Sequence, residues 1–238
     1  MIKKNLIPIL ADRFIPPIRN TYWTLLGRQR AYCLCFHDVS YNDSTYAITP
    51  EEFFSLINSV KDQIVSIDEL SNTAQKDPIV LTFDDGYESI ISTVAPFLSS
   101  QKIPFTCYVT TCYLNHDSYL SETQLKEASQ LQFCTIGSHM CTHGKTRQMT
   151  VEEIKKEWVY SKELLQELIC TEVRHAALPY GAYLSCSEKS KRIALMSGYN
   201  TIANTIATPF SKTNKEIFRY VYQKNNNRVE RLIEKLSM

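Results

Sequence analysis

Two adjacent carboxylates, Asp84 and Asp85, follow the apolar run IVLTF and precede Gly86. Two neighbouring carboxylates are costly to keep ionised together, and a bound cation would relieve their repulsion. Because successive side chains of an extended chain point to opposite sides, one could bind a metal while the other faces a substrate. An Asp-Asp-Gly turn that caps the next helix would explain the same residues equally well.

Two histidines, His139 and His143, follow a second apolar run, FCTIG at 133–137. Residues four apart can bind one ion, and imidazole with carboxylate suits Zn²⁺ and neighbouring transition metals. Alone the pair is a weak signal. At a strand end, beside Asp85, it predicts three protein ligands and an open position for water, as in a catalytic zinc site.

Positioning these groups requires a sheet whose strand ends meet. Short runs rich in β-branched and aromatic residues alternate with amphipathic stretches, which predicts parallel strands joined by helices. Either a (β/α) barrel or an open doubly wound sheet would gather function beyond the carboxyl ends of its strands. Expected strands are 32–36, 79–83, 105–110, 133–137, 174–178, 200–205 and 218–222, with a short piece near 64–67; expected helices are 50–61, 87–100, 122–130, 151–169, 186–197 and 227–236.

Two of these helices carry start signals. Thr49 with Glu52, and Thr150 with Glu153, have the spacing of capping boxes. The second helix is expected to bury an apolar stripe of Val151, Ile154, Trp158, Leu165 and Leu168.

Three segments together resemble the leading motifs of the polysaccharide deacetylase family, the nodulation-deacetylase group of carbohydrate esterases. They are TFDDG at 82–86, SHMCTH at 138–143 and ALPYGAY at 177–183, in the family's order. FHDV at 36–39 and the stretch 150–162 extend the resemblance. It implies a distorted (β/α) barrel of about seven parallel strands, and hydrolysis of an N-acetyl, or sometimes O-acetyl, group on a carbohydrate.

The resemblance also implies roles for individual residues. A divalent metal, most often zinc, would be bound by Asp85, His139 and His143, with Asp84 as the general base. The backbone N–H of Tyr180, in a Pro-Tyr-Gly turn that could otherwise be ordinary, would stabilise the tetrahedral oxyanion.

The chain departs from the family pattern at three points. Met140 stands where a small polar residue is usual, and Ala177 stands where an arginine often holds the base. Arg174 or Arg219 could replace that arginine, and Arg219 is preferred because it falls on the last expected strand. A surface arginine is the alternative reading of Arg219.

The late family motif, which supplies the histidine that acts as the general acid, is missing, since no histidine follows His175. His37, at the end of the first expected strand, would face the same mouth. We therefore predict His37 as the general acid or a substrate contact, with a structural histidine as the alternative. His116 and His175 are weaker candidates, because one falls in a loop and the other early in a strand.

Composition bounds the remaining predictions. The 238 residues, 44% hydrophobic, favour one catalytic domain over 31–238, and a formal net charge of +1 predicts no nucleic-acid partner. Residues 1–30 carry six lysines and arginines against one aspartate. We expect a basic extension packed on the domain, with peripheral contact to anionic lipid or a lipid-linked substrate as the alternative.

Cysteine usage and hydropathy indicate a compartment. No two of the eight cysteines are spaced as CxxC, which favours reduced thiols in a cytoplasmic protein. No stretch reaches the ~18 apolar residues of a membrane span. We expect a cytoplasmic protein, either free or peripheral to the membrane.

The function expected from these observations is removal of an acyl group, most simply acetyl, from a sugar or surface-polysaccharide precursor. A related C–N hydrolase acting on a formamido sugar or a cyclic amide is one alternative. A non-catalytic carbohydrate-binding descendant is another, motivated by the missing late motif. Phosphoryl transfer is disfavoured, because the chain has no GxxxxGK[ST] phosphate loop.

Overall fold

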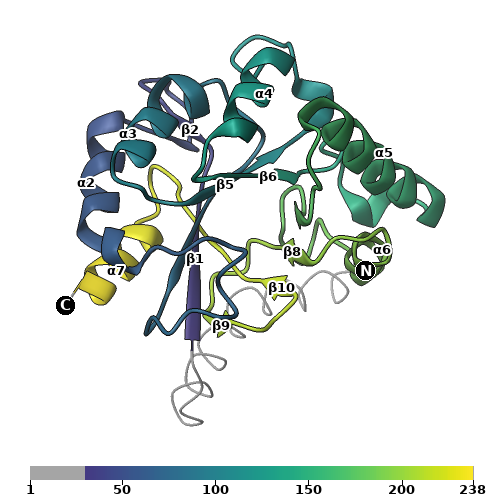
Figure 1. Cartoon of the computed structure of the whole chain (residues 1–238). Helices are drawn as coiled ribbons and strands as arrows, with labels where there is room; N and C mark the ends of the chain where they lie inside the picture. Colours follow the sequence, from purple (N-terminus) through teal and green to yellow (C-terminus); the bar gives the residue numbers. More distant parts are fainter. Residues whose placement is uncertain (1–29, 238) are drawn as a thin grey trace.

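The computed structural model describes residues 30–237, and its centre is a mostly parallel sheet of nine strands (Figure 1). The strand order is β10-β8-β7-β6-β5-β4-β1-β11, with β9 (Phe210–Ser211) antiparallel to β1. The parallel strands are β1 (Arg30–Phe36), β4 (Ile79–Phe83), β5 (Phe105–Val109), β6 (Cys134–Ser138), β7 (His175–Ala177), β8 (Thr201–Ala203), β10 (Glu216–Ile217) and β11 (Tyr220–Val221).

The two edges of this sheet belong to one continuous segment. Glu216–Ile217 pairs with β8, and Tyr220–Val221 pairs with β1 only three residues later. The segment therefore nearly closes the sheet into a barrel. Taking β10 and β11 as one strand, and leaving out antiparallel β9, gives seven parallel strands. The predicted distorted barrel is confirmed.

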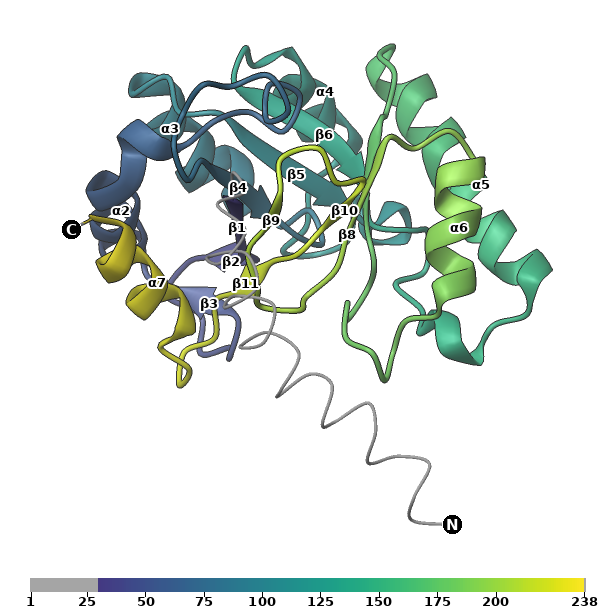
Figure 2. The same ribbon diagram turned by 90° about the horizontal axis from the view of Figure 1, so that it is seen from below.

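Helices surround the barrel because its strands are apolar on both faces. Figures 1 and 2 place α2, α3 and α7 on one side and α5 and α6 on the other, with α4 between them. Their bounds are α2 (Pro50–Val60), α3 (Ala95–Ser100), α4 (Glu122–Gln130), α5 (Val151–Ile169), α6 (Glu188–Met196) and α7 (Arg228–Ser237).

Both predicted capping boxes form, at Thr49 with Glu52 and at Thr150 with Glu153. Trp158 is fully buried on α5, and its Nε1 donates to Ser190 Oγ at 3.1 Å. The expected apolar stripe is wrong at Val151, which is 44% exposed, because the first turn of α5 lies outside the packed face.

Some predicted elements are shorter or broken. Only residue 64 of the 64–67 piece pairs, in an isolated bridge to Ile79. The expected helix 87–100 is a π-helical turn, η2 (Ile90–Val94), followed by α3, with Pro96 in the first turn of α3. Short pieces were not predicted: the pair β2 (Asp38–Val39) and β3 (Ala47–Ile48), strand β9, and the 3₁₀ turns η1 (Lys61–Gln63), η3 (Thr111–Tyr113) and η4 (Thr146–Gln148).

The basic extension predicted for residues 1–30 lies outside the described residues except for Arg30. That residue begins β1 and forms an ion pair with Asp77 at 3.2 Å. Within the described part of the chain, no helix combines the length and apolar character needed to cross a bilayer.

Candidate active site

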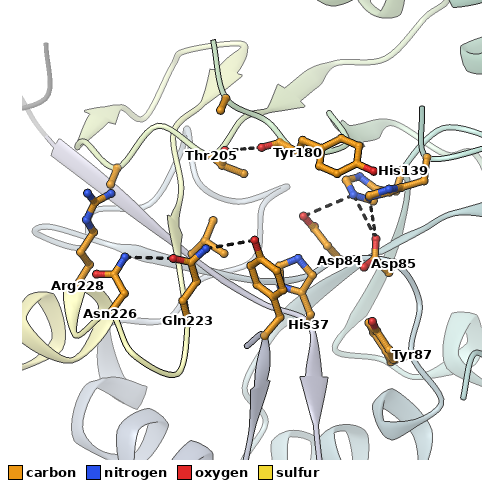
Figure 3. A pocket seen from close by; sticks show the side chains of 15 residues that line it. His37, Asp84, Asp85, Tyr87, His139, Tyr180, Thr205, Gln223, Asn226 and Arg228 are labelled. Carbon is orange, nitrogen blue, oxygen red and sulfur yellow. Dashed lines mark hydrogen bonds and ion pairs between the residues drawn. The ribbon is translucent and has the colours of Figure 1, made fainter. Parts of the chain in front are cut away.

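A cavity of about 340 Å³ opens at the carboxyl ends of the strands (Figure 3). Every residue predicted for the site except Arg219 lines it, and Arg219 is fully buried in contact with Asp84. Such strand-end cavities are where (β/α) barrels place their chemistry. The lining comprises His37, Tyr46, Asp84, Asp85, Tyr87, His139, His143, Tyr180, Ala182, Thr205, Ala207, Val221, Gln223, Asn226 and Arg228.

Asp84 and Arg219 form a buried bidentate ion pair. Nη1 and Nη2 of Arg219 donate to Oδ1 and Oδ2 of Asp84 at 2.6 and 2.8 Å, and both residues are at most 2% exposed. Arg219 Nε donates to the Asn204 carbonyl at 2.9 Å, which fixes the guanidinium plane. Burial alone would raise the pKa of Asp84, but the Arg219 charge outweighs it and holds this pKa well below its usual range.

Asp85, His139 and His143 converge at the other side of Asp84. Asp85 Oδ1 lies 3.5 Å from His139 Nε2 and 3.2 Å from His143 Nε2. Candidate ligand atoms of all three residues lie within 4.8 Å of one another. Among residues 30–237, no group donates to the buried Asp85 Oδ1 with good hydrogen-bond geometry, although the two imidazole nitrogens lie close, and a buried acceptor oxygen needs a partner.

The tautomer of His139 supports a cation at this point. His139 Nδ1 lies 2.9 Å from the Ala177 carbonyl, which can only accept, so Nδ1 carries the proton and Nε2 presents a lone pair. Burial lowers the pKa of His139 to about 4, although the Asp84 and Asp85 charges oppose it. The neutral imidazole and the orphaned carboxylate oxygen fit a divalent metal, with the carbonyl orienting the ring.

The backbone turns sharply where these ligands sit. Asp85, Met140 and His143 have φ of 71°, 67° and 58°, a region that non-glycine residues rarely occupy and that gathers at functional sites. The expectation that Asp84 and Asp85 point to opposite sides is therefore wrong, because Asp85 is not extended and both side chains line one cavity. The left-handed turn at Met140 lets its side chain enter the core, where it is fully buried.

Glu157 on α5 holds the loop between the two histidines. Its carboxylate accepts from the Cys141 and Thr142 backbone N–H groups, both at 2.9 Å, and from Thr142 Oγ1 at 2.7 Å. Sequence reasoning missed this residue. A carboxylate beside Trp158 and three positions after Ile154, on the buried face of a helix, is the signal that could have found it.

The Tyr180 turn is held against the same cavity. Tyr180 and Gly181 have φ of 62° and 58°, and the Tyr180 carbonyl accepts from Thr205 Oγ1 at 2.8 Å. A Cβ at Gly181 would lie 2.4 to 2.5 Å from Thr205 atoms, so glycine is required for both conformation and space.

His37 reaches the cavity from the end of β1, as expected. Its ring packs on Tyr46 with centroids 4.7 Å apart. Within the described residues its buried Nδ1 has no hydrogen-bond partner. Burial lowers the pKa of His37 against the opposing charges of Asp84 and Asp85.

The weaker candidates lie elsewhere. His116 is exposed in a loop. His175 Nε2 donates to Asp68 at 3.0 Å at the start of β7, and Arg174 forms an ion pair with the same Asp68. Arg228, Gln223 and Asn226, which line the cavity across from Asp85 (Figure 3), were not predicted, and no pattern in the sequence distinguishes them.

The fold and the site together define a barrel with a carboxylate and two histidines at its mouth. The polysaccharide deacetylase family model matches residues 71–202. YxkH of Bacillus subtilis (strain 168), whose name assigns it to the polysaccharide deacetylases, is 26% identical over 121 residues, covering 51% of this chain and 42% of YxkH. The chain thus matches less than half of that relative.

Solved structures share the fold at low identity. The Streptococcus pyogenes deacetylase PplD, in complex with acetate, superposes with a TM-score of 0.74 at 21% identity, over 87% of this chain and 98% of PplD. IcaB from Ammonifex degensii gives a TM-score of 0.77 at 19% identity, over 88% and 98%. The chain belongs to the polysaccharide deacetylase family.

Proposed function

We propose that this protein is a metal-dependent hydrolase that removes an N-acyl group, most simply acetyl, from a sugar or surface-polysaccharide precursor. One observation carries the proposal: a carboxylate held by a buried arginine lies beside an aspartate and two histidines in the same cavity. A protein that only binds carbohydrate has no need for the buried Asp84–Arg219 pair, so this observation favours catalysis.

Asp85, His139 and His143 would hold the metal, for which Zn²⁺ suits the donor set best. Bound there, it would supply a water of lowered pKa and polarise the acyl carbonyl. The carbonyl oxygen of Ala177 would keep His139 in its ligating tautomer, and Glu157 would keep the loop of His143 in place.

Asp84 would accept the proton of the attacking water, with Arg219 fixing the direction of its carboxylate. The Tyr180 N–H would donate to the developing oxyanion from a turn that Thr205 already holds in place. His37, which lines the same cavity, would complete the reaction by donating a proton to the departing amine.

The shape of the cavity bears on the substrate. About 340 Å³ lies within the range of small-ligand sites, which suits a sugar substrate. Arg228 lies across the cavity from Asp85, where its positive charge would contact the phosphate of a nucleotide- or lipid-linked sugar. Residence in the cytoplasm, with or without a peripheral lipid contact through the basic residues 1–30, stays a prediction of the same account.

The test is acetate release from a panel of N-acetylated substrates by zinc-loaded protein. The panel holds a nucleotide-linked N-acetylhexosamine, a lipid-linked one, a finished N-acetylated polymer and a formamido sugar. We expect acetate release from a linked precursor. Asp84→Asn should lower the rate of release about 10²- to 10⁴-fold. Asp68→Asn, at the far end of the barrel, should keep the wild-type rate. Acetate release from finished polymer alone would contradict a precursor as the substrate. No release from any substrate by folded, metal-loaded protein would contradict the assignment as a hydrolase.

A further inference from the structure

Two cysteines meet where the segment between His139 and His143 lies against the turn that follows β5. Cys112 Sγ and Cys141 Sγ are 3.1 Å apart, although 29 residues separate them in the chain. Cys112 lies in η3, the turn after β5, and Cys141 lies between His139 and His143. Neither thiol takes part in the proposed hydrolysis.

The backbone already aligns these two segments. Cys112 N donates to the Cys141 carbonyl at 2.9 Å, and Thr111 N donates to the Met140 carbonyl at 3.2 Å. A disulfide has an S–S length of about 2.0 Å, so the sulfurs need to approach by only about 1 Å. Side-chain rotation can supply such a shift without moving the two hydrogen-bonded backbones.

The pair is also accessible. Cys112 is exposed and Cys141 is half-buried, beside a surface hollow that α5 lines with Glu157 and Tyr160. Cys33, Cys35, Cys107 and Cys186 are instead buried, and exposed Cys170 lies apart at the end of α5.

We propose that Cys112 and Cys141 form a reversible intramolecular disulfide, a cross-link that fastens the loop of His139 and His143 to η3. The expectation that all eight cysteines are simply reduced thiols would then fail for this pair. The proposal rests on the positions of the two sulfurs and holds whether or not the protein is a deacetylase.

The oxidant is a small-molecule disulfide, and the reaction is thiol–disulfide exchange. The exposed Cys112 sulfur loses its proton, attacks one sulfur of the oxidant and releases one thiol, leaving a mixed disulfide on Cys112. Cys141 loses its proton and attacks the Cys112 sulfur, which releases the second thiol. The protein loses two protons and two electrons in all, and the oxidant takes them up to become two thiols.

The test incubates the folded full chain with oxidised glutathione, then counts free thiols in denaturant and maps linked peptides by mass spectrometry. We expect the Cys112 and Cys141 peptides of wild type to be joined, with no glutathione retained on either cysteine, and dithiothreitol to restore both thiols. Any glutathione taken up by exposed Cys170 is counted on its own peptide. Cys170→Ser, the matched control at an exposed cysteine, should form the same link. Cys141→Ser should stop at one glutathione adduct on Cys112.

A second readout separates a cross-link within the chain from one between chains. Oxidised wild type should stay monomeric on a non-reducing gel and should have a higher Tm than oxidised Cys112→Ser, because the link closes a long loop. The proposal is overturned if glutathione accumulates on Cys112 of wild type without closure, if the linked peptides contain another cysteine pair, or if the link joins two chains. None of these readouts uses a sugar substrate, so their failure is distinct from failure of the proposed function.

Discussion

Substituting Arg219 by methionine removes the partner of a buried charge. The guanidinium donates two short hydrogen bonds to Asp84 where both side chains are at most 3% exposed. Breaking a buried pair by removing one partner costs about 3–5 kcal/mol, because the remaining charge stays desolvated. For a chain of this size that corresponds to a fall in Tm of roughly 6–20 °C. Without Arg219, burial would also raise the pKa of Asp84 and weaken it as a carboxylate.

Denaturant unfolding of metal-free protein measures this cost, with Arg174→Met as the matched control. Arg174 pairs with Asp68 through a side chain that is 43% exposed, and such a pair contributes under about 1 kcal/mol. In the double variant Asp84→Leu/Arg219→Met the unpaired charge is gone, so it should be more stable than Arg219→Met alone. Two outcomes would show that no unpaired buried charge is left at Asp84. One is an equal loss of unfolding free energy in the two arginine variants. The other is a double variant whose loss equals the sum of the losses of its two single changes.

Three further predictions test the surroundings of the site. Glu157→Gln should weaken zinc binding about 10- to 100-fold by loosening the Cys141–Thr142 loop, while Glu163→Gln on the exposed face of the same helix leaves it unchanged; equal affinities in a zinc titration would exclude this positioning role. His37→Ala should lower kcat by at least about 10²-fold, and near wild-type turnover in an acetate-release assay would remove His37 from the mechanism. The hydrogen bond from His175 lowers the pKa of Asp68, so its stabilisation is present above the unfolded-state pKa near 4 and is lost as pH falls through the folded-state value. Asp68→Asn should therefore flatten the acid limb of stability against pH at a cost under about 1 kcal/mol at pH 7, and an unchanged acid limb in denaturant unfolding would contradict that assignment.

The barrel could be predicted because its signals are local. Each parallel strand is a short apolar run, and each capping box sits at the start of its helix. Strands β7 and β8 are only three residues long, shorter than predicted. The length of a strand depends on pairing with neighbouring strands, which cannot be read from the sequence of the strand itself. Closure of the barrel likewise depends on tertiary contacts. Within the six residues from Glu216 to Val221, β10 pairs with β8 at one edge of the sheet and β11 pairs with β1 at the other.

Most of the site residues could be predicted from the sequence, and Glu157 could not. Asp84, Asp85 and His139 follow strand ends directly, so the topology brings them together, and His143 lies four residues after His139 in the loop that follows β6. Arg219 was preferred to Arg174 because it falls in the last expected strand. In the structure it lies between β10 and β11 and donates to Asp84. Glu157 was not predicted because it lies 16 residues from Cys141, the loop residue whose N–H donates a hydrogen bond to it.

If Asp85, His139 and His143 bind one metal ion, as we propose, zinc-incubated and desalted protein should retain it, and elemental analysis measures the amount. We expect about one equivalent of zinc per chain in wild type and in His116→Ala, whose histidine lies in an exposed loop, and little in His139→Ala. Folded wild type that retains no zinc, or His139→Ala that retains as much as wild type, would show that these residues do not form the metal site.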